Sequence, residues 1–171
     1  YIPNGTAVVA VSTQRDLGVL IDKNLRFSNH IDLVCKRASV VANLILRKLV
    51  SRDHRIMCDM FCVYARPHVE YASEVWNPKA VCLIDKLERV QRHFTKQLVG
   101  LSDMSYVDRL AFLELDSLEF RRLIKDLVLT YKITHGQTIL NPDGYFESSV
   151  AFTRGHQYRL RPPKCNMTSS Q

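Results

Sequence analysis

Glu70 and Glu74 lie four residues apart in the stretch RPHVEYASEVWNPKA, close to His68 and to Trp76, the only tryptophan of the chain. Two carboxylates one helical turn apart could bind a metal ion or act as a general acid and base. A di-metal carboxylate site, however, needs glutamates from several helices and a Glu-x-x-His pair, and no histidine supplies that spacing. We therefore expect both glutamates to be solvated surface charges, and Trp76 to be a core anchor beside the kink at Pro67.

The cysteines, serines and aspartates predict no other catalytic or metal site. The five cysteines show no CxxC spacing, and Cys58 and Cys62 share a predicted helix face without a second pair, so we expect reduced, buried thiols rather than zinc ligands. No Cys or Ser stands with a His in a recognisable nucleophile motif, and no Gly-rich loop follows a strand. Asp16 and Asp22 could bind Mg²⁺, but no further carboxylate is predicted beside them, so we expect them to cap loops.

The pattern that predicts a function is a set of basic residues on two predicted helices. Five residues of a predicted helix after Pro78 fall within an arc of about 120° opposite its apolar stripe: Lys86, Arg89, Arg92, His93 and Lys96. Four cations on an earlier predicted helix form a second basic surface: Lys36, Arg37, Arg47 and Lys48. Charge alone leaves two interpretations open, contact with nucleic acid and a merely solvated face.

The solvated interpretation rests on pairing within the later helix. Asp85 precedes Arg89 by four residues, and Glu88 stands in the same relation to Arg92. Such acid-first pairs stabilise a helix by about 0.2 to 0.5 kcal/mol each. They would still leave the other three members of the cationic set unmatched.

The charge of the whole chain is placed unevenly. The formal net charge is +7, and residues 23–100 carry the surplus, with 14 Lys and Arg against 7 Asp and Glu. Hydrophobic residues make up 46% and charged residues 24%, as in a globular protein, and no stretch approaches the roughly 20 apolar residues of a membrane span. The basic middle favours a polyanionic partner such as nucleic acid and no membrane.

The elements that must position these residues begin with two strands. Short apolar runs at Ala7–Val11 and Leu17–Ile21, joined by the polar Ser12–Asp16, predict a β-hairpin. Ser28 is a good N-cap for a helix whose apolar residues repeat every three or four positions: Ile31, Val34, Cys35, Ala38, Val41, Ala42, Ile45 and Leu49.

A second helix is predicted to begin at an Asp53 cap. Its inward residues are expected to be Ile56, Met57, Met60, Phe61 and Tyr64. Pro67 kinks or ends it, because proline lacks the backbone donor of a helix interior. The chain then resumes helically, with Val69, Ala72 and Trp76 on one stripe, until the Asn-Pro pair at 77–78 stops it.

Three further helices follow. The first ends near Gly100 and buries six residues: Ile84, Leu87, Val90, Phe94, Leu98 and Leu101. Ser105 begins a short helix, and Ser117 begins a longer one that runs to Gly136. That last helix is expected to bury Leu118, Ile124, Leu127, Val128 and Tyr131.

Together these patterns predict a mainly α fold. A short N-terminal β-hairpin over residues 1–27 precedes a bundle of about five helices over residues 28–136. Residues 137–171 lose the helical period and contain NPDG, RGH and RPP, so they are predicted to form an extended, partly disordered tail.

Six segments carry a resemblance to a known family. They are DLGVLID, FSNHI, RPHVEYASEVWNP, LERVQRHFTKQLVGL, SYVDRL and LEFRRLIKDLVLTYKI, and RGHQYRL near the end fits with them. In order and approximate spacing they resemble the C-terminal part of the reverse transcriptase of jockey-like, non-LTR (LINE-type) retrotransposons. The resemblance covers nearly the whole chain, from Asp16 to Arg161.

The resemblance implies a thumb-like function. The strands would be the last elements of the polymerase palm or its junction, and residues 28–136 a thumb that holds template and primer, an RNA/DNA duplex bound through its backbone. The upstream palm and fingers would be its partners in the intact protein, an RNA-directed DNA polymerase that uses Mg²⁺. Action inside the cell, in the nucleus if the parent element is active, is implied too.

Two features predict that this chain does not polymerise DNA by itself. The family's paired catalytic aspartates lie in an upstream motif, and this chain has no Asp-Asp pair, so we expect no cofactor in it. The chain begins at Tyr1 and its first methionine is Met57, which suggests a fragment of a longer product. The alternative hypothesis is a non-catalytic helical interaction module, or a functionless relic of a mobile element.

Overall fold

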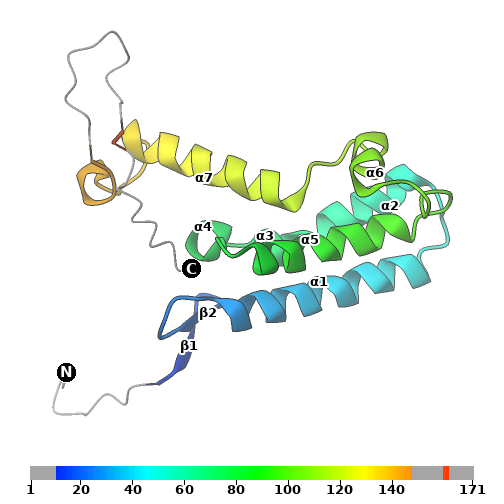
Figure 1. The fold of residues 1–171 in the computed structure, drawn as a ribbon, viewed down its shortest axis with the longest axis horizontal. Coiled ribbons are helices and arrows are strands. Elements are labelled where there is room, and N and C mark those ends of the chain that lie inside the picture. Colours follow the sequence, from blue (N-terminus) through cyan, green and yellow to red (C-terminus); the bar gives the residue numbers. More distant parts are fainter. Residues whose placement is uncertain (1–10, 148–159, 162–171) are drawn as a thin grey trace, which may run out of the picture. The chain divides into compact units, whose positions relative to one another are not determined.

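The computed structural model describes residues 11–147 and 160–161. The chain divides into two compact units, residues 1–125 and 126–171. The first contains a two-stranded sheet followed by helices, and Figure 1 shows their order along the chain. The prediction of a mainly α fold with an N-terminal β-hairpin is confirmed. Among the described residues, no helix is both long enough and apolar enough to cross a bilayer.

The hairpin lies later in the sequence than predicted. Strand β1 (Thr13–Asp16) pairs antiparallel with β2 (Val19–Asp22), and Asp16 lies opposite Val19. Leu17 and Gly18, both at positive φ, form a two-residue turn that fixes this register. The segment predicted to connect the two strands, Ser12–Asp16, therefore contains the first strand itself. Of the predicted first strand, only Val11 is described, outside any strand, and the rest lies outside the described residues.

Helix α1 (Ser28–Lys48) buries the predicted stripe. Five of its eight predicted inward residues are buried and the other three pack against the core. The prediction of Ser28 as N-cap is wrong. Phe27 takes the cap position in a left-handed conformation, and no side chain caps the helix.

The next helical segment follows the predicted course with two interruptions. Asp53 caps α2 (His54–Met60) as predicted, because its Oδ1 accepts the Ile56 N–H at 3.1 Å. A π-helical segment, η2 (Phe61–Ala65), then joins α3 (Pro67–Glu70), and short α4 (Ser73–Trp76) follows a break at Ala72 with φ 50°. The wider π turn suits a proline that cannot donate to the α-helical ladder. Of the predicted inward residues here, Ile56 and Tyr64 are exposed instead.

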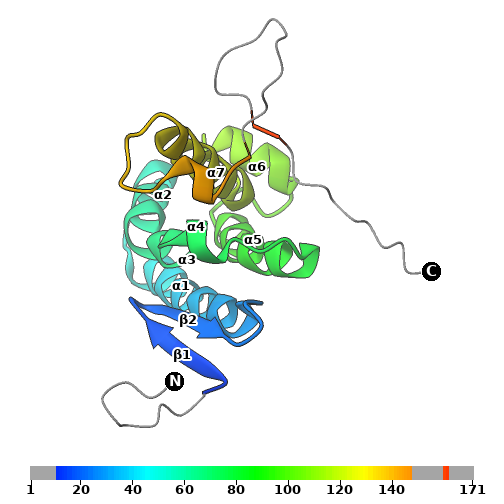
Figure 2. The same ribbon diagram turned by 90° about the vertical axis from the view of Figure 1, so that its left-hand side faces the viewer.

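Helix α5 (Val81–Lys96) runs beside α1 and parallel to it (Figures 1 and 2). Phe94 of α5 stacks on Phe61 with 4.5 Å between ring centroids, and Leu87 and Val90 are also buried. Gly100, at φ 76°, turns the chain so that Leu101 returns to the core.

Helices α6 and α7 and a short 3₁₀ turn follow α5. Ser105 caps α6 (Tyr106–Phe112) as predicted, since its side chain accepts the Asp108 N–H. Ser117 Oγ accepts the Phe120 N–H at the start of α7 (Leu118–Thr134), and a short 3₁₀ turn, η3 (Pro142–Gly144), lies in the second unit. Leu118 is buried, but the other predicted inward residues of α7 are exposed: Ile124, Leu127, Val128 and Tyr131.

Candidate nucleic-acid interface

Glu70 is not the surface charge that was predicted. Its side chain is buried, with the residue 7% exposed, and its carboxylate pairs with Arg121, with Arg66 Nε at 3.7 Å and with Lys125 Nζ at 3.8 Å. The prediction failed because the break at Ala72 separates Glu70 from Glu74, which is exposed as expected. Three cations around one carboxylate make a structural cluster that joins α3 to α7, not an acid/base pair.

The thiols do not form a metal site in the described part of the chain. No group of three or more His, Cys, Asp or Glu side chains there could hold a metal ion. Cys35 and Cys58 are buried, and burial raises the pKa of each thiol to about 11, so both stay protonated at neutral pH. Cys82 is exposed, contrary to prediction, and Cys165 lies outside the described residues.

The predicted cations of two helices do come together. Between α1 and α5 lies a hollow of about 500 Å³, here called the central hollow. Its α1 residues are Asp32, Cys35, Lys36, Ser39 and Asn43, and its α5 residues are Lys86, Arg89, Val90 and His93. Four of the nine predicted binding residues therefore share one surface, namely Lys36, Lys86, Arg89 and His93.

Helical spacing explains why these residues meet. At about 100° per residue, Asp32, Ser39 and Asn43 fall within about 40° of one another on α1. Lys86 and His93 share a face of α5 in the same way. Because the two helices are parallel, the rows run side by side, and the Cys35 thiol contacts the Lys86 carbonyl at 3.7 Å. These two rows of residues, one on α1 and one on α5, are here called the α1–α5 seam.

The central hollow keeps a surplus of positive charge. Among the described residues that line it, Asp32 is the only carboxylate, and it pairs with Lys86. Lys86 was predicted to be unmatched, so that prediction is wrong. Lys36 and Arg89, both exposed, also line the hollow, and their charges are available to a ligand.

A second hollow continues the seam toward the carboxyl ends of both helices. It measures about 310 Å³ and is lined by Leu46, Arg47, Arg52, Met57, Gln97, Leu98 and Val99. Arg47 was predicted as a binding residue, whereas Arg52 was missed. Arg52 lies in the loop after α1 and donates to the Leu46 carbonyl at 2.9 Å. No periodic pattern marks a loop residue, so a helical pattern could not identify Arg52.

The remaining predicted residues lie elsewhere on the two helices. Arg92 pairs with Asp85 at 3.9 Å and stacks over the Tyr106 ring, 5.1 Å from its centroid. Arg37, Lys48 and Lys96 are exposed but do not line the hollows described above.

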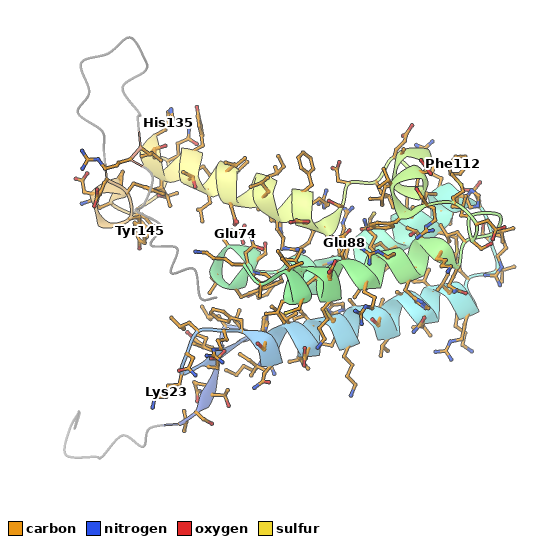
Figure 3. The ribbon with its side chains drawn as sticks, viewed as in Figure 1. Lys23, Glu74, Glu88, Phe112, His135 and Tyr145 are labelled. Atoms are coloured by element: carbon orange, nitrogen blue, oxygen red, sulfur yellow. The ribbon has the colours of Figure 1, made fainter. Side chains whose placement is uncertain are left out.

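The ion pairs predicted within α5 are wrong. Arg92 takes Asp85, the carboxylate predicted for Arg89. Glu88, predicted to pair with Arg92, turns inward, where it accepts the backbone N–H groups of Leu118 and Glu119 at 3.2 and 3.1 Å (Figure 3).

Comparison with known proteins finds a similar sequence but no matching family model. An uncharacterized protein of Caenorhabditis elegans is 28% identical over 133 residues, which cover 76% of this chain and 67% of the relative. No family model matches the chain, and no solved structure matches it.

Proposed function

We propose that this chain binds the sugar-phosphate backbone of nucleic acid along the α1–α5 seam. The observation that carries the proposal is the convergence of Lys36, Lys86, Arg89 and His93 in one hollow. Three of these four residues have no carboxylate among the ion pairs of the described residues, namely Lys36, Arg89 and His93. Phosphates are the ligands that such exposed, flexible cations suit best.

Backbone contact fits the seam better than base readout. Its cations lie along two parallel helices, so they follow a line of phosphates and present no single helix for insertion into a groove. The accessible face of an RNA/DNA duplex offers phosphates and sugar hydroxyls. Binding is therefore expected to depend strongly on salt and weakly on sequence.

The resemblance to the reverse transcriptase of non-LTR retrotransposons supplies the context of this proposal. The seam would hold template and primer, while upstream palm and fingers would provide the catalytic carboxylates and their Mg²⁺. Nuclear action of an active parent belongs to the same proposal. The resemblance and the basic seam support it from separate observations, one of sequence order and one of geometry.

One observation favours the alternative, a helical interaction module. Helix α7 carries large apolar side chains that are exposed in each unit: Phe120, Leu123 and Ile124 in the first, and Leu127, Val128 and Tyr131 in the second. Exposed apolar surface often marks contact with another protein. A module of that kind would not need a basic seam.

Changing Lys36 and Arg89 together to Gln should weaken binding of an RNA/DNA duplex. If both contact phosphates, the slope of log affinity against log salt should become shallower by about two units, at about 0.9 per contact. Fluorescence anisotropy over a salt series measures the slope. Circular dichroism should be unchanged, because both side chains are exposed.

The matched control is Arg15→Gln with Arg55→Gln. Both residues are exposed, and neither lines the central hollow, so the net charge falls equally without touching the seam. Equal loss of slope in the two double variants would show that overall charge, and not the seam, attracts the duplex. An unchanged slope in a folded Lys36 and Arg89 variant would favour the interaction module.

Asp32→Asn should have the opposite effect. Asp32 neutralises Lys86, so removing its charge should free that ammonium for one more phosphate and steepen the salt slope by about 0.9. Glu74→Gln, at an exposed position outside the hollow, is the control for a charge change of the same sign. A steeper slope in both variants would contradict a specific role for the pair between Asp32 and Lys86.

A further inference from the structure

A third hollow opens at the amino-terminal end of the seam, and its lining differs from that of the central hollow. It measures about 530 Å³ and is here called the amino-end hollow. It is lined by Leu25, Arg26, Phe27, Ser28, Trp76, Asn77, Pro78, Lys79, Ala80, Cys82 and Leu83. Most of these residues are apolar. Two are cations, and none of these described lining residues is a carboxylate.

The amino-end hollow belongs to the same seam. Ser28 precedes Asp32 by one helical turn on α1, and Cys82 precedes Lys86 by one turn on α5. At about 100° per residue, each step stays within about 40° of the same face. From Ser28 to Arg47 the seam is about 28 Å long, at about 1.5 Å per residue. A nucleic acid bound along it would reach this hollow at one end.

The loop that supplies Leu25, Arg26 and Phe27 to the hollow is held in a costly conformation. Leu25 and Phe27 have φ of 51° and 56°, a region in which side chains larger than glycine or asparagine are uncommon. The Asp22 carboxylate fixes the loop by accepting the backbone N–H groups of Asn24 at 3.0 Å, Arg26 at 3.2 Å and Phe27 at 2.6 Å. Such strain persists where surrounding contacts impose it, and it concentrates at binding sites.

The same hydrogen bonds make Asp22 a loop-capping carboxylate, as its position after the strand predicted. The hydrogen bond from the Arg26 N–H is the largest cause that lowers the pKa of Asp22; burial opposes it, and the N–H groups of Phe27 and Asn24 lower the pKa further. The carboxylate therefore stays ionised at neutral pH. It holds the backbone of Arg26 and Phe27, two residues that line the hollow.

We propose that the amino-end hollow takes an unpaired base at the end of a duplex bound in the seam. This inference rests on the proposed function and names its ligand more closely, a duplex with a single-stranded overhang. A base has flat apolar faces that suit Phe27, Pro78 and Leu83, and it is flanked by phosphates that suit Arg26 and Lys79. An apolar peptide would leave both cations without a partner, and a lone phosphate would leave the apolar lining unused.

The test compares three RNA/DNA duplexes of equal paired length by fluorescence anisotropy. One is blunt, one has an overhang of three nucleotides, and one has the same overhang with abasic sites in place of its bases. The two overhangs carry equal phosphate charge, so their difference reports contact with the bases. The intact overhang should bind about fivefold tighter or more, as stacked bases do on proteins.

Cys82→Trp locates the effect. Cys82 is exposed and lines the hollow, so tryptophan there should fill it and make the affinities for the intact and the abasic overhang equal. Val81→Trp is the control, since Val81 is exposed on the same turn but does not line the hollow. Should C82W fail to fold, Ala80→Trp fills the same hollow from another exposed position.

The outcomes separate this inference from the proposed function. Equal affinity for intact and abasic overhangs, together with salt-dependent binding of the blunt duplex, overturns the base pocket and leaves the seam intact. No binding of any duplex overturns both. A preference for bases that survives C82W and A80W overturns the assignment to the amino-end hollow.

Discussion

Replacing Trp76 with Ala is expected to lower the free energy of unfolding by about 3 to 5 kcal/mol, the usual cost of truncating a large buried aromatic side chain. Trp76 is 1% exposed and belongs to the core. Its ring packs edge-on against His30, with 5.3 Å between centroids. The indole N–H donates to the Tyr71 carbonyl at 2.8 Å.

That hydrogen bond adds to the loss of packing. Tyr71 stands at the break between α3 and α4, where Ala72 takes a left-handed conformation. Alanine at position 76 would leave a cavity and also remove the donor to the Tyr71 carbonyl, and a typical hydrogen bond contributes about 0.5 to 1.5 kcal/mol to stability. We therefore expect the loss to lie toward the upper end of the range.

Urea denaturation followed by circular dichroism measures the effect, because the variant has no tryptophan fluorescence. Val75→Ala is the matched control. Val75 precedes Trp76 on α4 and is 60% exposed, so its truncation should change stability by about 0.5 kcal/mol or less. A loss below about 1 kcal/mol for W76A would contradict the core position of the indole.

The burial of Trp76 and the course of α1 could be predicted because each depends on a local pattern. A stripe with the helical period must face something apolar, whichever neighbour supplies the surface. The same argument found α5 and its core residues Leu87 and Phe94. It failed for the far end of α7, whose apolar side chains Leu127 and Tyr131 remain exposed.

Glu70 shows why breaks in a helix were harder to predict. The prediction that it shares a solvated face with Glu74 assumed one continuous helix after Pro67. The π turn before Pro67 and the left-handed Ala72 rotate Glu70 into contact with Arg121. A non-glycine residue at positive φ leaves no mark in the sequence, because tertiary contacts impose it.

The basic residues of the candidate interface could be predicted one helix at a time, but the sequence did not predict that the two helices bring them together. The basic faces of α1 and α5 follow from their spacing, whereas their meeting depends on the path of the chain from α2 to α4 between them. Asp32 and Lys86, the ion pair of the central hollow, are 54 positions apart. No local pattern links residues so distant, so Lys86 was predicted to be unmatched.

Glu88 is the residue whose role differs most from its prediction, and its removal should be as costly as that of Trp76. It is 6% exposed, and its carboxylate accepts the N–H groups of Leu118 and Glu119 together with the Tyr106 hydroxyl. It thereby caps the amino end of α7 from another helix, where a negative charge is favoured by the helix dipole. Burial, and then its bond to Glu88, raises the pKa of the Tyr106 hydroxyl, which stays protonated and donates.

Glu88 also compensates a buried cation. Arg122 is 1% exposed, and among the described residues its two terminal nitrogens have no hydrogen-bond partner. Burial lowers the pKa of Arg122, and the charge of Glu88 is the largest opposing influence. Removing one member of a buried set of charges leaves the other uncompensated, which is strongly destabilising.

We therefore expect Glu88→Ala to lower the free energy of unfolding by about 3 to 5 kcal/mol, because it leaves the N–H groups of Leu118 and Glu119 and the Tyr106 hydroxyl without their acceptor and removes a negative charge that acts on buried Arg122. Glu88→Gln keeps the shape and one acceptor oxygen but loses the charge, so it should cost about half as much. Urea denaturation followed by Trp76 fluorescence measures both, with Glu74→Ala as the exposed control on another helix. An E88Q variant as stable as the wild type would contradict this capping role, since the carboxylate accepts through both of its oxygens and glutamine keeps only one of them.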